Sequence, residues 1–314
     1  MIRLLLRRLA ALPLILLATA AILYVLAFAS PYDPAEAYVT AYGPEVRLEL
    51  REQYARAWGL DRPPAAQFAT WMGQVLRGDL GRSRLLSGQP VAEVLAARAG
   101  PSALLLGVTL VVVLAGGLLA GVLAGAFRDT WVDWAVRVSS YATVFAPSFW
   151  IAMLLIWLFA VHLQWLPAGG TGNLRAAPRS AGGVWGIEPA YLVLPVLALA
   201  LTQHGWFTLY VRNTLLEVLR EDYVRYAQGQ GMSRGRVLFR HALPNALIPF
   251  VTLIGTHIPE LIGGAVLIES IFGWPGLGSL TRQAALAVDL PLLLAIILCG
   301  AVLVVLGNAL SDLL

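Results

Sequence analysis

The sequence predicts an all-α, polytopic membrane protein with six transmembrane helices, and three observations lead to this prediction. The chain of 314 residues is 59% hydrophobic and only 13% charged, with a mean hydropathy of +0.74, whereas a soluble domain carries about 25% charged residues. Six apolar runs reach the roughly 20 residues that a spanning helix needs. Arginine gathers in alternate connections between the runs, as expected for cytoplasmic loops. The runs cover approximately 9–29, 102–127, 138–161, 191–211, 246–268 and 290–310.

The first run is predicted to remain as a membrane span with its amino end in the cytoplasm. Three arginines within 3–8 precede it, and the tripeptide Ala-Phe-Ala at 27–29 ends it, a combination that also fits a secretory signal with its cleavage site. The apolar stretch of about 21 residues is longer than the roughly 7–15 residues of a signal's hydrophobic region. We therefore favour an uncleaved span over a signal peptide.

The distribution of arginine supports this orientation. With the amino end inside, 128–137 and 212–245 are cytoplasmic and together carry eight arginines, whereas the outer connections 162–190 and 269–289 carry three. Segment 30–100 has eight arginines and eight acids, but loops of this length contribute little to the charge rule. We predict that 30–100 is a helical extracytoplasmic insertion between the first and second spans.

The insertion contains two predicted helices. Residues 45–58 are charged and fit a short helix after a Pro-containing turn, while 68–80 alternate apolar and polar side chains at helical spacing and could lie along the membrane surface. The other sizeable outer segment, 167–189, is rich in Gly, Ala and Pro, and is predicted to be irregular.

The second apolar run carries Gly117, Gly121 and Gly125 at intervals of four residues. This small-xxx-small spacing lets helices approach closely in lipid. It predicts tight packing of the second span and says little about function.

A polar segment, 221–246, separates the fourth and fifth apolar runs. Asp222–Gln230 is rich in helix-forming residues and has an acid at its start, which favours a helix. Gly231 is predicted to end that helix, because glycine tolerates positive φ. A second helix is expected from about Arg236 to Leu243-Pro244. Taken alone, the segment could be an ordinary positively charged inner loop that Gly and Pro merely punctuate.

The spacing within this segment resembles the EAA loop of bacterial ABC importer permeases. The consensus of that loop is E-A-A, three residues, Gly, nine residues, Ile, any residue and Leu-Pro. Ala227, Gly231 and Leu243-Pro244 match it. The first Glu, the first Ala and the Ile of the consensus are replaced by Arg225, Tyr226 and His241.

Further segments extend this resemblance over nearly the whole chain. They are VLRGDLGRS at 75–83, PVAEVLAAR at 90–98, PSFW at 147–150, WLPAGG at 165–170 and ESIFGWPGLGSL at 269–280. In this order they are similar to the first permease subunit of dipeptide, oligopeptide and nickel ABC importers. Segment 256–260, Thr-His-Ile-Pro-Glu, departs from the usual Leu- and Gly-rich pattern.

The resemblance implies a type I ABC importer permease in the bacterial inner membrane, a single permease domain over 1–314 with no catalysis of its own. The implied partners are a second permease subunit, two ATP-binding subunits that hold ATP and Mg²⁺, and an extracytoplasmic solute-binding protein. Peptides are the expected cargo, ahead of nickel and other small solutes. The residues that would form the ATPase-coupling loop are Glu221, Asp222, Arg225, Ala227, Gly231, Ser233, Arg234, Arg236, Arg240, Leu243 and Pro244.

Within that loop, Ala227 and Gly231 lie four residues apart on one face and could leave room for a partner's groove, with the arginines around the contact.

Polar residues inside apolar runs are candidates for the translocation path. Glu260 and His257 lie three apart, on one face of a helix, and His204 lies in the fourth run. Such groups usually face a cavity or each other. Glu260 could line the passage and favour a cationic group, or it could belong to an ion pair or hydrogen bond that holds two spans together. The second alternative is favoured.

The aromatic motif around Trp274, Pro275 and Gly276 lies in the last outer connection. It could contact a docking protein, or it could be a tight turn with a Trp in the interface belt.

Composition excludes several other functions. The chain contains no lysine, so it lacks the residue that a P-loop needs to hold nucleotide phosphates. Its arginines form no single basic face, which argues against nucleic-acid binding. With one cysteine, Cys299, no intrachain disulfide can form. The four histidines lack metal-ligand spacing.

Two alternative functions fit the sequence less well. An ion-coupled secondary transporter would call for internal repeats, of which we find none, and a membrane-embedded enzyme would need a catalytic His, Asp and Glu cluster.

Overall fold

The computed structural model describes residues 2–29, 34–39, 44–57, 59, 61–172 and 187–313. Throughout these residues the ordered elements are helices, and the only β-type pairing among them is an isolated bridge between Arg82 and Pro90. The chain divides into two compact units. Unit 1 comprises residues 1–100 and 276–306, and unit 2 comprises residues 101–275 and 307–314.

Unit 1 is built from both ends of the sequence. Its core brings Val91, Val94 and Leu95 together with Leu280 and Leu292. Short helices occupy 44–57 and 64–76, close to the two helices expected within 30–100, and the second starts and ends four residues earlier than expected. The elements of unit 1 are α1 (Ile2–Ala29), α2 (Pro34–Val39), α3 (Pro44–Ala57), α4 (Pro64–Leu76), the start of α5 (Val91–Ala126), α12 (Leu277–Leu286) and most of α13 (Leu290–Leu313).

A buried carboxylate ties the insertion to the start of α13. Asp289 is fully buried and accepts hydrogen bonds from the Ser83 hydroxyl at 2.7 Å and from the backbone N–H of Leu85 at 2.8 Å. Its second oxygen accepts the N–H of Leu292 at 3.3 Å, in the first turn of α13. These bonds compensate for the removal of the carboxylate from water.

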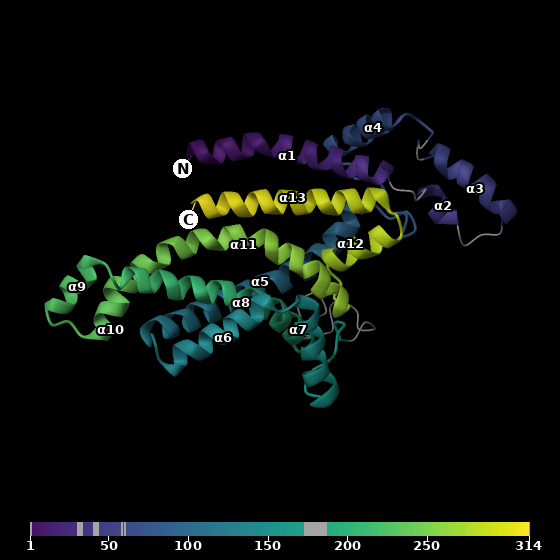
Figure 1. Ribbon diagram of the computed structural model, residues 1–314. Coiled ribbons are helices and arrows are strands. Elements are labelled where there is room, and N and C mark those ends of the chain that lie inside the picture. The colour runs from purple at the N-terminus through teal and green to yellow at the C-terminus, as the bar shows by residue number, and fades with distance from the viewer. Residues whose placement is uncertain are drawn as a thin grey trace. The chain divides into compact units, whose positions relative to one another are not determined.

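Unit 2 is a helical bundle centred on α8 (Figure 1). Side chains of α7, α8 and α11 form its main core cluster, which includes Ile151, Leu199 and Ile268. The remaining elements of unit 2 are the rest of α5, α6 (Trp131–Phe145), α7 (Ser148–Leu155), the π-helix η1 (Ile156–His162), α8 (Pro189–Val218), α9 (Asp222–Gly229), α10 (Arg234–Val237), the π-helix η3 (Leu238–Ala242) and α11 (Leu243–Ile271).

Four of the described helices are long and apolar enough to cross a membrane: Leu12–Ala29, Val91–Ala126, Pro189–Val218 and Leu290–Ala309. The structure differs from the straight span expected over 138–161. Helices α6 and α7–η1 form a pair bent by 109°, which makes a fifth span if it is counted as one. The bend falls at Ala146-Pro147, where Ala146 is extended with ψ 132, because the proline ring disfavours a helical residue before it.

The glycine stripe of the second apolar run packs closely on α8, as predicted. A Cβ on Gly117 would lie 2.8 Å from Cβ of Phe207, and one on Gly125 would lie 2.8 Å from Cδ2 of Leu215. Between them, a Cβ on Gly121 would meet the α8 backbone. The three glycines therefore form a shallow groove in α5 that receives one face of α8. Most of the predicted irregular segment 167–189 lies outside the described residues.

Candidate functional site

The polar segment between α8 and α11 folds into two short helices joined by a tight turn. Helix α9 begins at Asp222, as predicted, and ends at Gly229, one residue before the predicted end. Gly231 has φ +81, which confirms its expected role in ending the helix, since L residues with side chains rarely adopt this conformation. The second helix starts at Arg234 rather than Arg236, and continues through η3 into α11.

The two helices are held together by a small apolar cluster. Val224 and Ala227 of α9 pack on Val237 of α10, with Met232 from the connecting turn beside them. Ala227 is only 6% exposed. The expectation that Ala227 leaves space for a partner's groove is therefore wrong, because its small side chain fills the contact between α9 and α10. Gly231 does remain open, since a Cβ added there would have no heavy atom within 4 Å.

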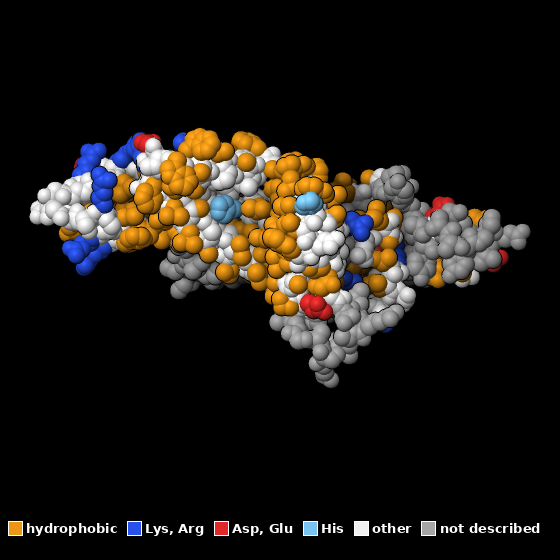
Figure 2. All heavy atoms as spheres, turned by 90° about the horizontal axis from the view of Figure 1, so that it is seen from below, with side chains coloured by type: hydrophobic (Ala, Val, Ile, Leu, Met, Phe, Trp, Pro, Cys, Tyr) orange, Lys and Arg blue, Asp and Glu red, His pale blue; other side chains and the backbone are white. Residues whose placement is uncertain are grey.

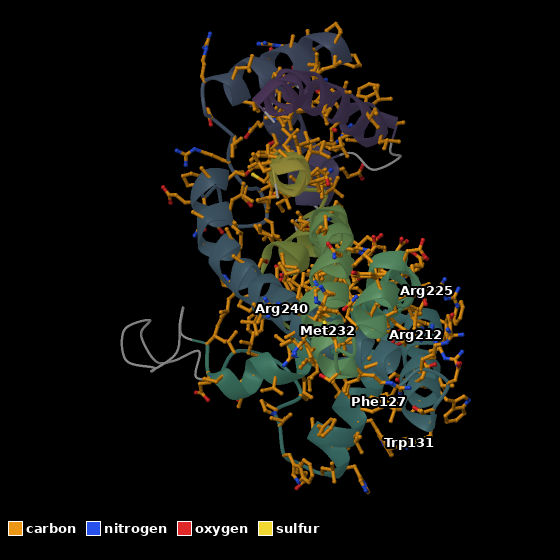
Figure 3. The ribbon with its side chains drawn as sticks, turned by 90° about the vertical axis from the view of Figure 1, so that its left-hand side faces the viewer. Phe127, Trp131, Arg212, Arg225, Met232 and Arg240 are labelled. Atoms are coloured by element: carbon orange, nitrogen blue, oxygen red, sulfur yellow. The ribbon has the colours of Figure 1, made fainter. Side chains whose placement is uncertain are left out.

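The outer surface of this pair is basic and aromatic. Figure 2 shows basic side chains clustered over the end of unit 2 that carries α9 and α10, next to helices covered by hydrophobic side chains. Figure 3 views this end, where Arg225 and Arg240 are labelled beside Met232. Tyr226 is 71% exposed and Phe239 is 63% exposed. Aromatic residues and arginine are enriched at protein–protein interfaces.

The remaining predicted coupling residues lie in α9, in α10 or in the segments that adjoin them. Arg225 lies 3.8 Å from Asp222, an exposed pair within α9, and exposed pairs of this kind contribute little stability. Leu243 and Pro244 form the first turn of α11, where a missing N–H is tolerated. The other predicted residues at this end that are solvent-exposed are Glu221, Ser233, Arg234, Arg236 and Arg240.

Sequence reasoning did not assign a role to the exposed aromatic side chains of this surface. Tyr223 and Tyr226 lie three residues apart in α9 and are exposed, on a face next to the one that buries Val224 and Ala227. That spacing of large aromatic residues, away from the buried face, is the signal that could have identified them.

A buried ion pair fixes the helix that carries this surface. Arg212 near the end of α8 donates to Asp133 of α6 through two hydrogen bonds, Nε to Oδ1 at 2.6 Å and Nη2 to Oδ2 at 2.8 Å. The Asp133 side chain is fully buried, and that of Arg212 is 12% exposed. Asp133 also accepts the N–H of Asp129 at 3.1 Å. This bidentate geometry fixes α6 against α8.

The pair of helices α9 and α10 is also linked to the start of α11. The side-chain amide of Asn245 donates to the Tyr223 hydroxyl at 3.0 Å and to the carbonyl of His241 at 2.9 Å. A hydrogen bond thus connects α9 to the first turn of α11, and helical backbone connects α10 to α11 through η3.

Two of the three predicted path residues are brought together. His257 Nδ1 lies 2.8 Å from Glu260 Oε2 on α11, and the ring of His257 packs on Phe207 of α8 with centroids 4.8 Å apart. The contact between His257 and Glu260 lies within one helix, so it does not hold two spans together by itself; the aromatic contact joins α11 to α8. The Glu260 side chain is 58% exposed in the isolated chain.

His204 lies elsewhere on α8. Its Nδ1 is 3.3 Å from the Thr208 hydroxyl, and its ring faces Gly116 of α5. Among the hydrogen bonds of the described residues, none joins His204 to the pair formed by His257 and Glu260. The three residues therefore do not form one hydrogen-bonded cluster, and their place along a passage stays a prediction.

The motif around Trp274 is packed into unit 2. Trp274 is fully buried, its indole N–H donates to the carbonyl of Pro101 at 3.1 Å, and it contacts Leu105 and Val196. This packing gives Trp274 a structural role. Pro275 is half-buried and Gly276 is buried, so contact of this motif with a docking protein stays a prediction.

Two segments that carried the resemblance meet at this motif. The N–H of Gly170 donates to the carbonyl of Phe272 at 2.7 Å. Gly169 leaves no room for a Cβ because the backbone of Phe272 lies against it. The WLPAGG and FGW segments are therefore packing partners.

Sequence reasoning missed Glu269, whose carboxylate is fully buried in unit 2. It accepts a hydrogen bond from the Ser102 hydroxyl at 2.6 Å, and its carbonyl accepts the N–H of Trp274 at 2.8 Å. Ser102 and Glu269 are 167 positions apart. An acid at the end of an apolar run was the available signal, since a buried acid needs partners.

No group of three or more His, Cys, Asp or Glu is placed to hold a metal ion within the ranges that the structure describes.

Comparison with known proteins agrees with this arrangement. Residues 117–314 match the family described as "Binding-protein-dependent transport system inner membrane component", and residues 1–89 match its N-terminal counterpart, "Binding-prot-dependent transport system membrane comp, N-term".

Several curated relatives are similar along nearly their whole length. The oligopeptide transport system permease protein AppB of Bacillus subtilis is 35% identical over 300 residues, which cover 96% of this chain and 92% of the relative. A putative peptide transport system permease protein of Brucella suis biovar 1 is 37% identical, covering 100% and 96%. The probable D,D-dipeptide transport system permease protein DdpB of Escherichia coli is 33% identical, covering 93% and 89%.

These matches and the helical, apolar architecture agree with each other. The chain belongs to the family of binding-protein-dependent transport system inner membrane components, as a non-catalytic permease subunit of the ABC peptide importer type.

Proposed function

We propose that this chain forms half of the translocation path of an ATP-driven peptide importer and that segment 212–245 couples it to a separate ATPase. The observation that carries the proposal is the folding of α9 and α10 into a compact pair with its own apolar contact. The pair stands at one end of unit 2, where basic side chains gather (Figures 2 and 3), and Tyr223 and Tyr226 are exposed on it. A partner protein can bind such a pair as a single rigid unit.

Rigidity is what coupling requires. If α9 could move independently of α10, movement of an ATPase would be absorbed by the connecting turn. The contact of Val224 and Ala227 with Val237 opposes that movement. The helical backbone then runs from α10 through η3 into α11, and the paired Arg212 and Asp133 hold α8 to α6. A displacement of the pair is therefore passed to three membrane helices.

The proposed topology has six spans, with the amino terminus and segment 212–245 in the cytoplasm. Helix α11 has 29 residues and a length of about 43 Å at 1.5 Å per residue, which is sufficient for a hydrocarbon core of about 30 Å. Together with the four apolar helices and the bent pair of α6 with α7–η1, it completes the set. The extra arginine of the inner segments supports this orientation.

The proposed assembly contains a second permease subunit, two ATP-binding subunits and an extracytoplasmic solute-binding protein. ATP and Mg²⁺ are bound by the ATPase subunits, consistent with the absence of lysine from this sequence. Peptide cargo is proposed because the relatives named above are oligopeptide, peptide and D,D-dipeptide permeases.

A pair of glycine substitutions tests the coupling role. Neither Gly231 nor Gly235 has a heavy atom within 4 Å of an added Cβ, but only Gly231 has positive φ. A β-branched residue is strongly disfavoured at positive φ. Gly231→Val should therefore disturb the turn between α9 and α10, while Gly235→Val serves as the matched control.

The measurement is ATP-driven peptide uptake by the complete importer in proteoliposomes, together with its ATPase rate. We expect Gly231→Val to lower uptake per ATP about fivefold or more, the factor that corresponds to roughly 1 kcal/mol, and Gly235→Val to retain uptake. Equal uptake by the two variants would contradict the coupling role. Full uptake by the purified chain without companions would contradict the importer assignment and favour the ion-coupled alternative.

A further inference from the structure

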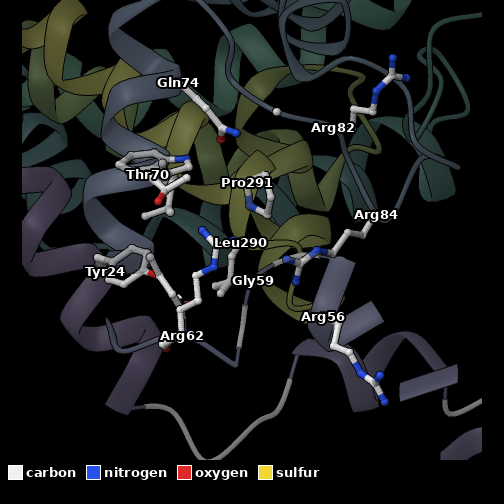
Figure 4. A pocket seen from close by; sticks show the side chains of 14 residues that line it. Tyr24, Arg56, Gly59, Arg62, Thr70, Gln74, Arg82, Arg84, Leu290 and Pro291 are labelled. Carbon is white, nitrogen blue, oxygen red and sulfur yellow. Dashed lines mark hydrogen bonds between the residues drawn. The ribbon is translucent and has the colours of Figure 1, made fainter. Parts of the chain in front are cut away.

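Unit 1 contains a cavity of about 530 Å³ (Figure 4) that the transport function above does not use. Cavities of roughly 300–1,000 Å³ are typical of small-molecule sites. Its wall is formed by the end of α1, the end of α3, residues 59 and 62, helix α4, the loop at 81–84 and the start of α13. The lining residues are Tyr24, Arg56, Gly59, Arg62, Gln67, Thr70, Trp71, Gln74, Gly81, Arg82, Arg84, Leu290, Pro291 and Leu294.

The cavity is strongly cationic. Four arginines line it, and its described lining contains no acidic residue. Figure 4 shows Arg62 and Arg84 extending toward one another across the cavity, whereas Arg56 and Arg82 point away at its edge. Arg56 is paired with Glu52 at 2.8 Å in an exposed bridge. The guanidinium groups that point into the cavity are therefore those of Arg62 and Arg84, and guanidinium groups bind anions such as phosphate.

A buried hydrogen-bond donor also lines the cavity. The indole Nε1 of Trp71 is buried and has no acceptor among the residues that the structure describes. Buried polar groups normally have a partner. An oxygen atom of a ligand in the cavity could provide it, which gives the site a neutral donor beside the two guanidinium groups.

The cavity lies at the ends of two apolar helices. Tyr24 comes from the apolar window of α1, Leu12–Ala29, and Leu290 and Leu294 come from the first turns of α13. Tyr24 is fixed there by its hydroxyl, which donates to Gln67 Oε1 at 2.8 Å, and by an edge-on contact with Phe68, with ring centroids 5.4 Å apart. The ends of spanning helices lie at the depth of the lipid headgroups.

The side chains of helix α4 also indicate that the cavity lies at the depth of the lipid headgroups. None of its residues is buried, and the apolar side chain of Leu76 is 81% exposed. The helix also alternates apolar and polar side chains. A helix of this kind lies in the membrane interface. The cavity is thus bounded by charged groups on one part of its wall and by Leu290, Pro291 and Leu294 on another.

We propose that this cavity binds the phosphate headgroup of an acidic phospholipid. The guanidinium groups of Arg62 and Arg84 and the Trp71 N–H face the phosphate oxygens, because arginine recognises phosphate through charge-assisted hydrogen bonds. The apolar wall from α13 contacts the glycerol and the start of the acyl chains. A lipid is favoured over a free anion because only a lipid matches both the charge and the apolar wall.

The test uses the purified full-length chain in detergent and native mass spectrometry of bound lipid. The probes are phosphatidylglycerol, phosphatidylcholine of the same acyl chains, and inorganic phosphate as competitor. The variants are Arg62→Gln, Arg84→Gln and Trp71→Phe, which keeps the ring and removes the N–H. Arg77→Gln is the matched control, an exposed arginine of the same insertion that does not line the cavity.

We expect phosphatidylglycerol to bind more tightly than phosphatidylcholine, with inorganic phosphate a weak competitor. Arg62→Gln and Arg84→Gln should each weaken phosphatidylglycerol binding about fivefold, because one interfacial basic residue contributes roughly 1 kcal/mol. Trp71→Phe should weaken it severalfold, and Arg77→Gln should not. An unchanged far-ultraviolet circular dichroism spectrum will show that each variant is folded.

Three results would overturn the proposal. Equal affinity for the two lipids would remove the role of charge. Equal phosphatidylglycerol binding by the cavity variants and by Arg77→Gln would place the lipid elsewhere. Displacement of phosphatidylglycerol by inorganic phosphate at comparable concentration would identify a free-anion site. Each of these results leaves the transport function untouched, because neither ATPase nor uptake is measured.

Discussion

The close approach of α5 and α8 at Gly121 leads to a quantitative prediction about stability. In Gly121→Ala, the added Cβ would lie 2.7 Å from the carbonyl oxygen of Thr208 and 2.7 Å from Cβ of Val211. Carbon atoms in contact prefer about 3.5–4.0 Å, so α8 must shift by about 1 Å. Because both opposing atoms are backbone or next to it, a change of rotamer cannot relieve the clash.

The expected magnitude follows from two opposing terms. Overpacking a close contact costs about 1–3 kcal/mol, and the rigid neighbours of Gly121 favour the upper end of that range. Alanine gains about 1 kcal/mol over glycine in a helix interior. The net destabilisation of Gly121→Ala is therefore about 2 kcal/mol. Gly107→Ala, on the same helix with nothing within 4 Å of its added Cβ, should be stabilised by about 1 kcal/mol.

The assay is equilibrium unfolding of the full chain in mixed micelles, followed by circular dichroism as the denaturing detergent increases. The two variants should differ by about 3 kcal/mol, the sum of the two terms. A difference below about 0.5 kcal/mol would show that α5 and α8 do not approach as described, or that the groove yields without cost.

Two further predictions concern polar contacts. Arg212→Lys should destabilise the chain by about 1.5–3 kcal/mol, because lysine cannot reproduce both hydrogen bonds to buried Asp133. The control is Arg137→Lys: Nε of Arg137 is 3.4 Å from Asp133 and its side chain is 40% exposed, so this variant should cost under about 1 kcal/mol in the same unfolding assay. Equal losses for the two variants would argue against the bidentate pair of Arg212 and Asp133. Glu260→Gln keeps an acceptor for His257 but removes the charge, so uptake of cationic peptides by the complete importer should fall more than uptake of neutral peptides. An equal fall for both classes would exclude Glu260 from selecting charge in the passage.

Local features of the fold could be predicted from the sequence because short-range physics decides them. The spacing of Gly117, Gly121 and Gly125 places them on one face of a helix whatever surrounds it. The structure shows that this face packs on α8. Gly231 ends α9 because its positive φ is accessible without a side chain. In both cases the conformation is set within a few residues of sequence.

Features that depend on distant residues could not be predicted. Arg212 and Asp133 are 79 positions apart, and the sequence shows only that each is charged near the end of an apolar run. The burial of Ala227 depends on Val237 folding back across the turn. The same small side chain would fit an external groove or an internal contact, so its residue type did not decide between them.

The bend between α6 and α7 shows a third limit of prediction from the sequence. Pro147 was visible in the sequence, and its effect on Ala146 is a general rule. The rule predicts a local departure from helix but not its angle, because proline in a membrane helix can also be accommodated with a modest kink. The 109° bend depends on how α6 and α7 pack on α8.

The division of unit 1 between both ends of the chain has a consequence for biosynthesis. Its core joins Val91 and Leu95 to Leu280 and Leu292, so nearly 200 residues separate the two halves. At about 5–20 residues per second, the ribosome needs roughly 10–40 s to make the second half. Unit 2 is almost contiguous and can assemble meanwhile. A nascent chain truncated before residue 277 would consequently expose the apolar side of its first hundred residues, a ready target for quality-control proteases.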